Sequence, residues 1–455
     1  MRILQVNTFD QGGGAENVVL GLHRQYVKQG HQANLFVKKR RTKEDGVSEL
    51  SPQIGRGWLS RALLNLADRL DRKPRKIRGT GSSGQALRML ARPSAALERW
   101  LGHEDFDFPS GQDMLDKMSE KPDVVQAHNL HGNYFDLRSL PDLTLRVPTV
   151  LTLHDCWLMS GHCAHSFCCE KWRDGCISCP DISIYPRLNS DGAHYNWKRK
   201  RRLLERSSYY LAAPSSWLLE KAQSSILGLG SKEGRVIFNG IDDSFFFSPD
   251  KATARDNLGL PQDALILLFT ANSIRDNEWK DFYTLRRSVL DLFAMFEDRP
   301  IICLALGDDG PEEILGSSCI RFIPFEESPA KVAEYYAAAD LYLHAAREET
   351  FSLSVAEAMA CGLPVVATAV GALPERVNDW ETASSEAATG KLVAVGDSKG
   401  MTQAAYDVLS QMDFARKLGE NASRIARRDY RQESQAKAYL DWFNTIIQRP
   451  TATLA

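Results

Sequence analysis

The fold is decided by residues 348–362, which read Glu-Glu-Thr-Phe-Ser-Leu-Ser-Val-Ala-Glu-Ala-Met-Ala-Cys-Gly. A short apolar run at Leu341–Ala345 precedes this stretch, and a second run at Pro364–Thr368 follows it. Short continuous apolar runs are typical of buried strands in a parallel sheet. The stretch between them predicts a loop and then a helix that holds Glu357. We therefore expect a strand–helix–strand unit, with its loop at the sheet edge where such folds bind ligands.

The same alternation of apolar runs and helical patterns extends along the chain, which predicts an α/β fold. With 455 residues, the chain fits two Rossmann-like domains of about 200 residues each. The predicted strands are Ile3–Val6, Gln32–Val37, Val124–His128, Thr149–Leu153, Tyr210–Ala213 and Arg235–Phe238 in the first half, and Ile266–Ala271, Ile301–Leu306, Ile320–Ile323, Leu341–Ala345 and Pro364–Thr368 in the second.

Turn residues at Phe238–Asp242 indicate the boundary between the two halves. We therefore predict a first domain over residues 1–240 and a second over residues 241–427. Residues 428–455 are expected to form a helix, over Tyr430–Gln448, that packs back towards the first domain. The sequence Gly-Thr-Gly-Ser-Ser-Gly at Gly79–Gly84 predicts a flexible loop.

Composition narrows the class of protein. The formal net charge of −2 excludes an overall electrostatic attraction to nucleic acid. No apolar run reaches the length of about 18 residues that spans a bilayer. Residues 1–7 resemble a buried strand more than a signal peptide. We expect a cytoplasmic protein whose membrane contact, where it has one, is peripheral and at the inner face of the cell membrane.

The helix predicted after residue 351 has the features of a phosphate site. Its first N–H groups, near Ser352 and Leu353, lack partners within the helix and carry a partial positive charge. Glu349 and Glu357 flank this point, eight positions apart. Carboxylates accept hydrogen bonds from hydroxyls, so one suits a donor sugar and the other a ribose. A helix start with a capping acid would explain the same pattern.

This stretch resembles the Glu-x7-Glu motif of the retaining glycosyltransferases of family 4, which have the GT-B fold of two Rossmann-like domains facing a central cleft. The resemblance implies that Glu349 contacts the donor sugar and Glu357 holds the nucleotide ribose. It also implies that Phe351, Ser352 and Leu353 offer backbone N–H groups to the donor. Residues 359–366 and 371–375 resemble the same family.

The loop at Thr270–Asp281 follows a predicted strand. The resemblance implies that Arg275 and Lys280 neutralise the donor diphosphate there. Fixed cations lower the barrier because negative charge builds on the leaving phosphate as the glycosidic bond breaks. The family usually has Lys-Gly where this chain has Lys280-Asp281. Two solvated cations would be the alternative.

In the first half, the loop Asp10–Glu16 contains three glycines, which allow close backbone approach to a ligand. A tight turn would need the same residues. The resemblance implies that Gly13 and Gly14 face the donor phosphates and the acceptor. Histidines end two predicted strands, at His128 and His154. By resemblance His154 reaches the donor sugar near the reacting carbon, with His128 as a secondary candidate.

Six of the nine cysteines lie between Cys156 and Cys179. Cys176 and Cys179 have the spacing that lets two thiolates meet one zinc ion. The segment 156–180 resembles a cysteine-rich insertion of some bacterial polysaccharide glycosyltransferases. The matching positions are Cys163, Cys169, Cys176 and Cys179, which predict a closed structural zinc site, with Cys156 and Cys168 as extra thiols. Free thiols, or disulfides formed on purification, remain an alternative.

Two segments are strongly basic. The stretch Gly55–Arg78 combines basic residues with apolar residues at helical spacing, which is typical of a helix that lies in a lipid interface. Its basic residues are Arg56, Arg61, Arg69, Arg72, Lys73, Arg75, Lys76 and Arg78, and its apolar residues are Trp58, Leu59, Ala62, Leu63, Leu66 and Leu70. The second basic segment is Lys198–Arg202. A membrane contact would fit a lipid-pyrophosphate-linked acceptor; a solvated helix on its own domain is the alternative.

Together these features predict a retaining glycosyltransferase that moves a sugar from a nucleotide-sugar donor to a glycan or lipid-linked acceptor, in exopolysaccharide or cell-surface polysaccharide biosynthesis. The resemblance implies that the departing phosphate accepts the acceptor proton, so catalysis needs no cofactor. The metal-like motif at Asp105–Asp107 is set aside because it lies far from the donor loops. An epimerase would lack the two glutamates, and a phosphorylase would need a pyridoxal lysine that we do not identify. An inactive scaffold that binds a nucleotide or a membrane partner is the alternative from another class.

Overall fold

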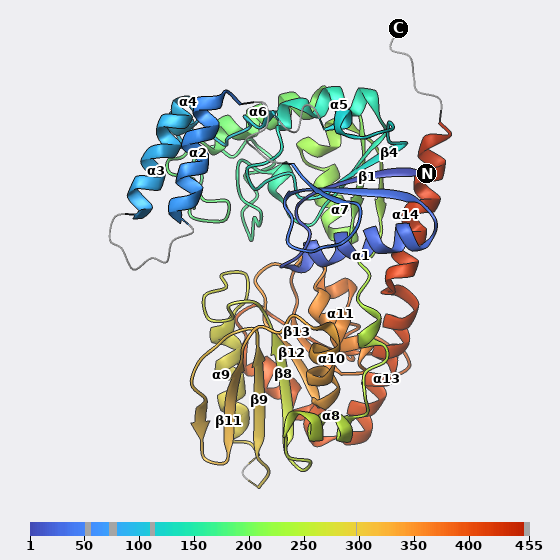
Figure 1. Ribbon diagram of the computed structural model, residues 1–455. Coiled ribbons are helices and arrows are strands. Elements are labelled where there is room, and N and C mark those ends of the chain that lie inside the picture. Colours follow the sequence, from blue (N-terminus) through green and yellow to red (C-terminus); the bar gives the residue numbers. More distant parts are fainter. Residues whose placement is uncertain (51–55, 72–79, 110–113, 297, 450–455) are drawn as a thin grey trace. The chain divides into compact units, whose positions relative to one another are not determined.

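The computed structural model describes the chain except for residues 51–55, 72–79, 110–113, 297 and 450–455 (Figure 1). The chain divides into two compact units. The first unit contains Met1–Ala213, Leu219–Val236 and Tyr439–Ala455, and the second contains Pro214–Leu218 and Ile237–Ala438. Each unit is built on one largely parallel sheet, so the predicted α/β architecture of two Rossmann-like domains is confirmed.

The sheet of the first unit has the strand order β3-β2-β1-β4-β5-β6-β7, and all its pairs are parallel. Its strands are β1 (Arg2–Phe9), β2 (Gln32–Lys39), β3 (Val47–Glu49), β4 (Val124–Ala127), β5 (Thr149–Thr152), β6 (Tyr209–Ala213) and β7 (Ser231–Val236). Its helices are α1 (Gly14–Lys28), α2 (Trp58–Asp71), α3 (Thr80–Ala91), α4 (Pro93–Trp100), α5 (Leu140–Arg146) and α6 (Ala193–Glu205). Helices α7 (Ser216–Gln223) and α14 (Gln432–Ile447) each begin in the second unit and end in the first.

The sheet of the second unit has the order β10-β11-β9-β8-β12-β13-β14, with β10 antiparallel to β11 and the other pairs parallel. Its strands are β8 (Leu265–Thr270), β9 (Ile301–Leu306), β10 (Glu313–Leu315), β11 (Ser318–Ile323), β12 (Leu341–His344), β13 (Val365–Thr368) and β14 (Gly390–Val393). Its helices are α8 (Lys251–Leu258), α9 (Phe282–Phe293), α10 (Pro329–Ala338), α11 (Leu353–Ala360), α12 (Ser398–Ser410) and α13 (Met412–Asp429). Short 3₁₀ turns lie at Leu115–Lys117, Leu137–Ser139, Trp157–Met159, Ile226–Gly230, Asp243–Phe245 and Leu373–Glu375.

Successive residues of the central strands enter two different cores, because side chains alternate across a strand. Ile266 and Leu268 of β8 pack in the core formed with α8, α10, α11 and α13. Leu265 and Leu267 of the same strand pack in the core formed with α9 and α12. Both faces of the sheet are therefore covered, which explains why β8 and β9 read as continuous apolar runs.

The structure differs from the sequence-based expectations at several elements. Strand β7 begins and ends earlier than predicted, because Phe238 leaves the strand and packs against Arg376 and Tyr430. The short strands β3, β10 and β14 were not predicted. The predicted loop after residue 79 is wrong for residues 80–84, which begin α3. Gly84 is buried, and α3 packs on α2. Among the described residues, no helix is long and apolar enough to span a bilayer.

Each sheet reverses its strand order at one point. In the second unit β9 lies on one side of β8 and β12 on the other, and in the first unit β2 and β4 flank β1 in the same way. Ligands of doubly wound sheets bind beyond the carboxyl ends of the strands at this reversal. The loops that follow β8, β12, β1 and β4 are therefore where a site is expected.

Candidate active site

A lysine, a glutamate and a histidine meet beyond the ends of β8 and β12. The Nζ atom of Lys280 forms an ion pair with Oε1 of Glu349. Nε2 of His344, the last residue of β12, lies 3.1 Å from the same oxygen. Burial alone would raise the pKa of Glu349, but Lys280 and His344 outweigh it and hold this pKa well below its usual range. Glu349 is therefore an ionised, largely buried acceptor of hydrogen bonds.

Backbone contacts between two loops bring this group together. The N–H of Asp281 donates to Ala345 at 3.1 Å, and Lys280 forms an antiparallel bridge with Ala346. The carboxylate of Asp281 also accepts from the N–H and hydroxyl of Thr284, so it caps the start of α9. The aspartate that stands where family members usually have glycine is thus a helix cap.

The second glutamate of the motif lies in a tyrosine-rich part of the same unit. Oε2 of Glu357 accepts a hydrogen bond from the hydroxyl of Tyr336 at 3.0 Å. Burial raises the pKa of Glu357 to about 7. The hydroxyls of Tyr336 and Tyr342 each lie 3.0 Å from Oγ1 of Thr270, and the ring of Tyr342 stacks on His344. These contacts form a continuous path from Glu357 to Glu349 through β12.

Helix α11 begins between the two glutamates, and the side chain of its N-cap residue does not bond to its first N–H groups. Its N-cap residue, Ser352, has φ 67° and ψ 86°, a left-handed conformation that is unusual for a residue with a side chain. The Ser352 hydroxyl makes no cap bond and lies 3.3 Å from Nε2 of His344. Phe351 packs edge-on against Tyr430, which fixes the loop. The N–H groups that begin at Leu353 are therefore oriented to bind an anion.

Arg275 has different partners from Lys280. Its guanidinium forms an ion pair with Asp308 at 3.1 Å and contacts the Asp309 carbonyl, both in the loop after β9. The structure thus brings Lys280 and Glu349 into contact and pairs Arg275 with Asp308 instead. Sequence reasoning did not single out Asp308 or His344. His344 could have been found, because it lies near the end of the predicted strand Leu341–Ala345, as His128 and His154 lie at the ends of theirs.

In the first unit, the glycine loop is held by a buried aspartate. Asp10 accepts hydrogen bonds from the N–H groups of Arg41 and Thr42, at 2.7 and 2.9 Å. Gly12 has φ 125°, a conformation that favours glycine. Gly13 is the N-cap of α1 without a side-chain cap bond, and Gly14 is its first residue. The predicted glycines therefore lie at the start of a helix, close to the carboxylate of Glu16.

The two predicted histidines touch each other. Nδ1 of His128, which follows β4, lies 3.0 Å from Nε2 of His154, which follows β5. Burial lowers the pKa of His154 to about 4, and burial also lowers the pKa of His128. Both imidazoles are therefore neutral near pH 7, and suit hydrogen bonding to hydroxyls better than proton donation.

A third histidine in this unit was missed by the sequence analysis. Nε2 of His131 lies 2.7 Å from Oδ2 of Asp155, the residue after His154. Burial alone would lower the pKa of His131, but Asp155 outweighs it and raises this pKa. The imidazole is tilted against Trp157 and meets Tyr185 edge-on. The sequence signal was weak, because His131 lies three residues beyond the strand end.

The four predicted zinc ligands line one cavity in the first unit, together with His162. Nε2 of His162 lies 3.4 Å from Sγ of Cys179, and the Gly161 N–H donates to Sγ of Cys176 at 3.1 Å. Burial raises the pKa of Cys163 to about 11 and that of Cys176 to about 12. Within the described parts of the chain, no three His, Cys, Asp or Glu side chains are placed to hold a metal ion. The residue types fit zinc and the side-chain placement does not, so zinc stays a prediction.

We expect the purified protein to contain about one equivalent of zinc, since the four cysteines that line this cavity match the number and kind of ligands in a closed structural zinc site. Elemental analysis of untagged protein measures this. The double substitution of Cys176 and Cys179 by serine should remove the metal, whereas Cys168→Ser, at an exposed thiol, should retain it. Metal-free wild-type protein with titratable thiols would contradict the expectation.

The two Rossmann-like units, with a lysine–glutamate pair beside an open helix start, define a GT-B glycosyltransferase. A family model described as Glycosyltransferase Family 4 matches residues 12–245, and one described as Glycosyl transferases group 1 matches residues 266–411. The chain belongs to glycosyltransferase family 4.

Named relatives agree with this family. The chain is 25% identical over 462 residues to "Putative colanic acid biosynthesis glycosyl transferase WcaC" of Escherichia coli (strain K12), covering 98% of this chain and 100% of that protein. It is 27% identical over 224 residues to N-acetyl-alpha-D-glucosaminyl L-malate synthase of Bacillus anthracis, covering 48% of this chain and 55% of that protein. Among solved structures, Anabaena Alr3699/HepE in complex with UDP and glucose shares the fold, with a TM-score of 0.60, 16% identity, and coverage of 98% of this chain and 100% of that one.

Proposed function

We propose that this chain is a retaining glycosyltransferase that moves a sugar from a nucleotide-sugar donor to a glycan or lipid-linked acceptor in exopolysaccharide or cell-surface polysaccharide biosynthesis. The observation that carries the proposal is the contact of Lys280, Glu349 and His344 at the start of α11. The printed name of the Escherichia coli relative supports a polysaccharide product, and the UDP and glucose of the Anabaena structure support a nucleotide-sugar donor.

On the donor side, the diphosphate would lie against the open N–H groups of α11 and the ammonium of Lys280. Lys280 would neutralise the charge that builds on the leaving phosphate. The ionised Glu349 would accept hydrogen bonds from hydroxyls of the donor sugar. Glu357 would do the same for the ribose, and Arg275 would exchange Asp308 for a phosphate oxygen.

In the first unit, we assign hydrogen bonding to two histidines, one for the donor sugar and one for the acceptor. The neutral His154 would bind hydroxyls of the donor sugar, in line with its lowered pKa. His131 is oriented by Asp155, and its buried Nδ1 has no hydrogen-bond partner among the described residues. This atom would orient an acceptor hydroxyl, while the departing phosphate takes the proton.

A panel of nucleotide sugars tests the function. We expect one donor to bind in calorimetry, to yield a nucleoside diphosphate, and to give a product with the anomeric configuration of the donor by NMR. Glu349→Ala should lower turnover by about 10²-fold or more. Glu420→Ala, at an exposed carboxylate of the same unit, is the matched control. Donor binding without turnover across acceptors would favour the inactive-scaffold alternative, and inversion of configuration would contradict retention.

A further inference from the structure

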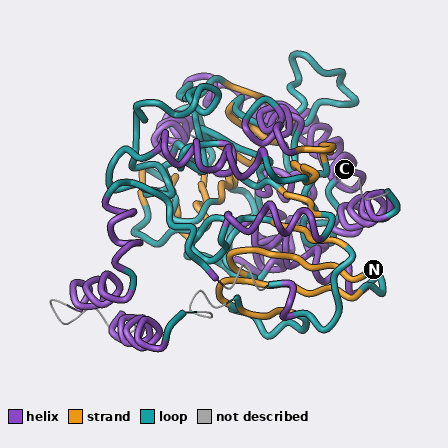
Figure 2. The backbone as a smooth tube through the Cα atoms, turned by 90° about the horizontal axis from the view of Figure 1, so that it is seen from above, coloured by secondary structure: helices purple, strands orange, loops and turns teal. Residues whose placement is uncertain are grey.

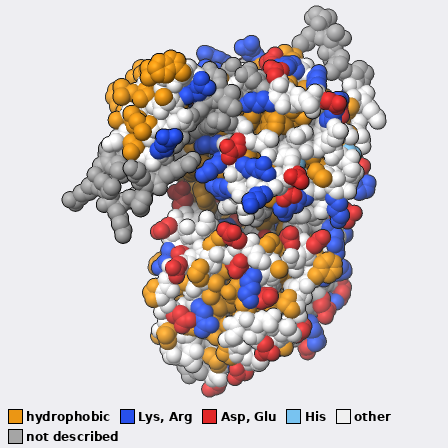
Figure 3. Space-filling model, in the orientation of Figure 1, with side chains coloured by type: hydrophobic (Ala, Val, Ile, Leu, Met, Phe, Trp, Pro, Cys, Tyr) orange, Lys and Arg blue, Asp and Glu red, His pale blue; other side chains and the backbone are white. Residues whose placement is uncertain are grey.

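Helices α2, α3 and α4 of the first unit expose many large apolar side chains. Trp58, Leu90 and Trp100 are 75%, 71% and 68% exposed. The other exposed apolar side chains of this segment are Leu59, Leu66, Met89, Leu97 and Leu101. Figure 3 shows apolar side chains gathered on the part of the surface formed by α3 and α4. A soluble surface rarely gathers so many large apolar groups without a partner. We call these eight side chains the apolar patch.

The patch is continuous across the three helices. The hydroxyl of Ser60 donates to the carbonyl of Ala91 at 3.0 Å, so the start of α2 lies beside the end of α3. Helix α4 begins two residues later, at Pro93. Trp58 and Leu90 therefore belong to neighbouring turns, and α4 extends the surface to Trp100. Figures 1 and 2 both show α2 and α3 side by side, set apart from the sheet of their unit.

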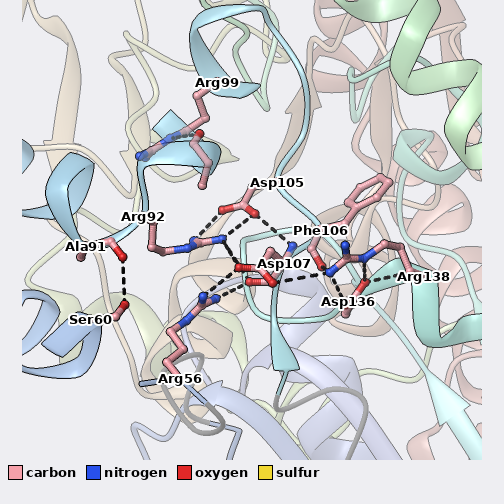
Figure 4. Close-up of polar contacts among 11 residues, drawn as sticks. Arg56, Ser60, Ala91, Arg92, Arg99, Asp105, Phe106, Asp107, Asp136 and Arg138 are labelled. Atoms are coloured by element: carbon pink, nitrogen blue, oxygen red, sulfur yellow. Dashed lines mark hydrogen bonds and ion pairs between the residues drawn. The ribbon is translucent and has the colours of Figure 1, made fainter. Parts of the chain in front are cut away.

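An ion-pair network fixes the base of these helices (Figure 4). Arg92 binds Asp105 at 2.6 Å and Asp107 at 3.2 Å. Arg56 binds Asp107 at 2.8 Å, and Arg138 joins Asp107 to Asp136. The side chains of Arg56, Arg92 and Asp105 are 9%, 14% and 9% exposed, whereas those of Asp107 and Arg138 are half exposed, so the network is partly buried. The helices are thus anchored with the apolar patch facing outward.

The expectation that both basic segments lie on the surface is wrong for some of their residues. Arg56 is engaged with Asp107 and is not available to lipid. In the second basic segment, Lys200 is fully buried and paired with Glu104 at 2.9 Å, and Arg199 lies over the ring of Phe106. Arg56 and Lys200 therefore form ion pairs within the protein and do not belong to the basic surface. Arg72, Lys73, Arg75, Lys76 and Arg78 lie outside the described residues.

Cations still dominate the segment that carries the apolar patch. Arg61, Arg69 and Arg99 are exposed on α2 and α4. By sequence, residues 56–100 contain Arg56, Arg61, Arg69, Arg72, Lys73, Arg75, Lys76, Arg78, Arg88, Arg92 and Arg99 against Asp68, Asp71 and Glu98. The whole chain has a net charge of −2, so this excess is local. A second copy of the chain would bring like charges together, whereas an anionic partner would be attracted.

We propose that the apolar patch docks on an anionic lipid bilayer, with Trp58, Leu90 and Trp100 at the boundary between headgroups and acyl chains. Tryptophan is enriched at this depth because its ring is apolar and its N–H is polar. Arginines at the rim would contact lipid phosphates. The bilayer satisfies both properties of the surface, since its interior is apolar and its headgroups are anionic.

Co-sedimentation of the full chain with vesicles tests the proposal. We expect the protein to bind vesicles of phosphatidylcholine mixed with phosphatidylglycerol, and to bind pure phosphatidylcholine at least tenfold more weakly. The triple substitution Trp58→Ser, Leu90→Ser and Trp100→Ser should lower the affinity by at least tenfold. Leu145→Ser, at an exposed leucine of α5 in the same unit, is the matched control and should bind like wild type.

A second variant keeps the test independent of folding. Replacing Arg61, Arg69 and Arg99 by glutamine changes only exposed side chains, and should weaken binding to anionic vesicles and reduce its salt dependence. Equal binding of wild type and both variants would overturn the proposal. So would a lipid-free dimer, seen by light scattering, that the triple substitution converts to a monomer. Donor binding should be unchanged in every variant, so this test fails or succeeds separately from the proposed function.

Discussion

Replacing Lys280 by alanine is expected to lower kcat by about 10²- to 10³-fold, with a smaller change in KM for the donor. The ammonium sits on Glu349 and beside His344, beyond the end of β8. A fixed cation at this place acts mainly when the phosphate leaves, because that is when charge develops. Its removal should therefore affect the transition state more than the ground state.

Steady-state kinetics with the donor found in the nucleotide-sugar panel measure this effect. Lys251→Ala, which removes another lysine–carboxylate pair of the second unit, that of Lys251 with Asp340, is the matched control and should keep kcat. A structural role must be separated from a chemical one, since Lys280 also lowers the pKa of Glu349. Thermal unfolding of the double variant with Glu349→Gln does this, because a purely structural pair predicts that stability lost in Lys280→Ala recovers when both charges are removed. Unchanged turnover in Lys280→Ala would refute the assignment.

Replacing Glu357 by glutamine is expected to weaken nucleotide binding by about 10- to 100-fold, the equivalent of one or two hydrogen bonds to a charged group. The glutamate is partly buried, and its pKa is raised to about 7. Its ionised form accepts two ribose hydroxyls better than its protonated form. Nucleotide affinity of the wild type should therefore rise as the pH increases from about 6 to about 8, because binding selects the deprotonated carboxylate.

Calorimetry of the nucleoside diphosphate across this pH range measures the effect. The glutamine variant should show a flat profile, since it has no group that titrates at this position. Tyr336→Phe removes the hydrogen bond that stabilises the ionised carboxylate, so it should move the wild-type rise to higher pH. A glutamine variant with the same pH slope as the wild type would show that another group is responsible.

The sheets were predictable because their strands are buried on both faces. Residues 301–306 form β9 as predicted, since six consecutive apolar residues have no other stable place. Short edge strands such as β14 escaped because three or four residues with mixed polarity carry little pattern. The helix that begins at Thr80 escaped because packing against α2 outweighs the weak helix propensity of glycine and serine.

The candidate site was predicted in part. Glu349 and Glu357 came from the Glu-x7-Glu motif and its spacing, and Lys280 came from the family resemblance of the loop after β8. The structure brings Lys280 to Glu349. The residues that set the charge states of the two glutamates were not visible in the sequence. Tyr336 reaches Glu357 because α10 packs against α11, and His344 reaches Glu349 through the conformation of the loop after β12. The pairing of Arg275 with Asp308 joins two loops that lie 33 positions apart along the chain.

The sequence by itself determined the α/β alternation, the two sheets and the loops that carry chemistry, because these follow from local patterns of burial and from the ends of strands. Only the tertiary structure decided which charged side chains form buried ion pairs within the protein and which lie at the candidate site or on the surface. In the sequence, Lys200 and Arg56 look like the surface cations next to each of them. In the structure, each is buried against an acid from a distant segment. The reason is physical: a charge is used internally only where the fold supplies a counter-charge to offset its desolvation, and no local pattern encodes that meeting.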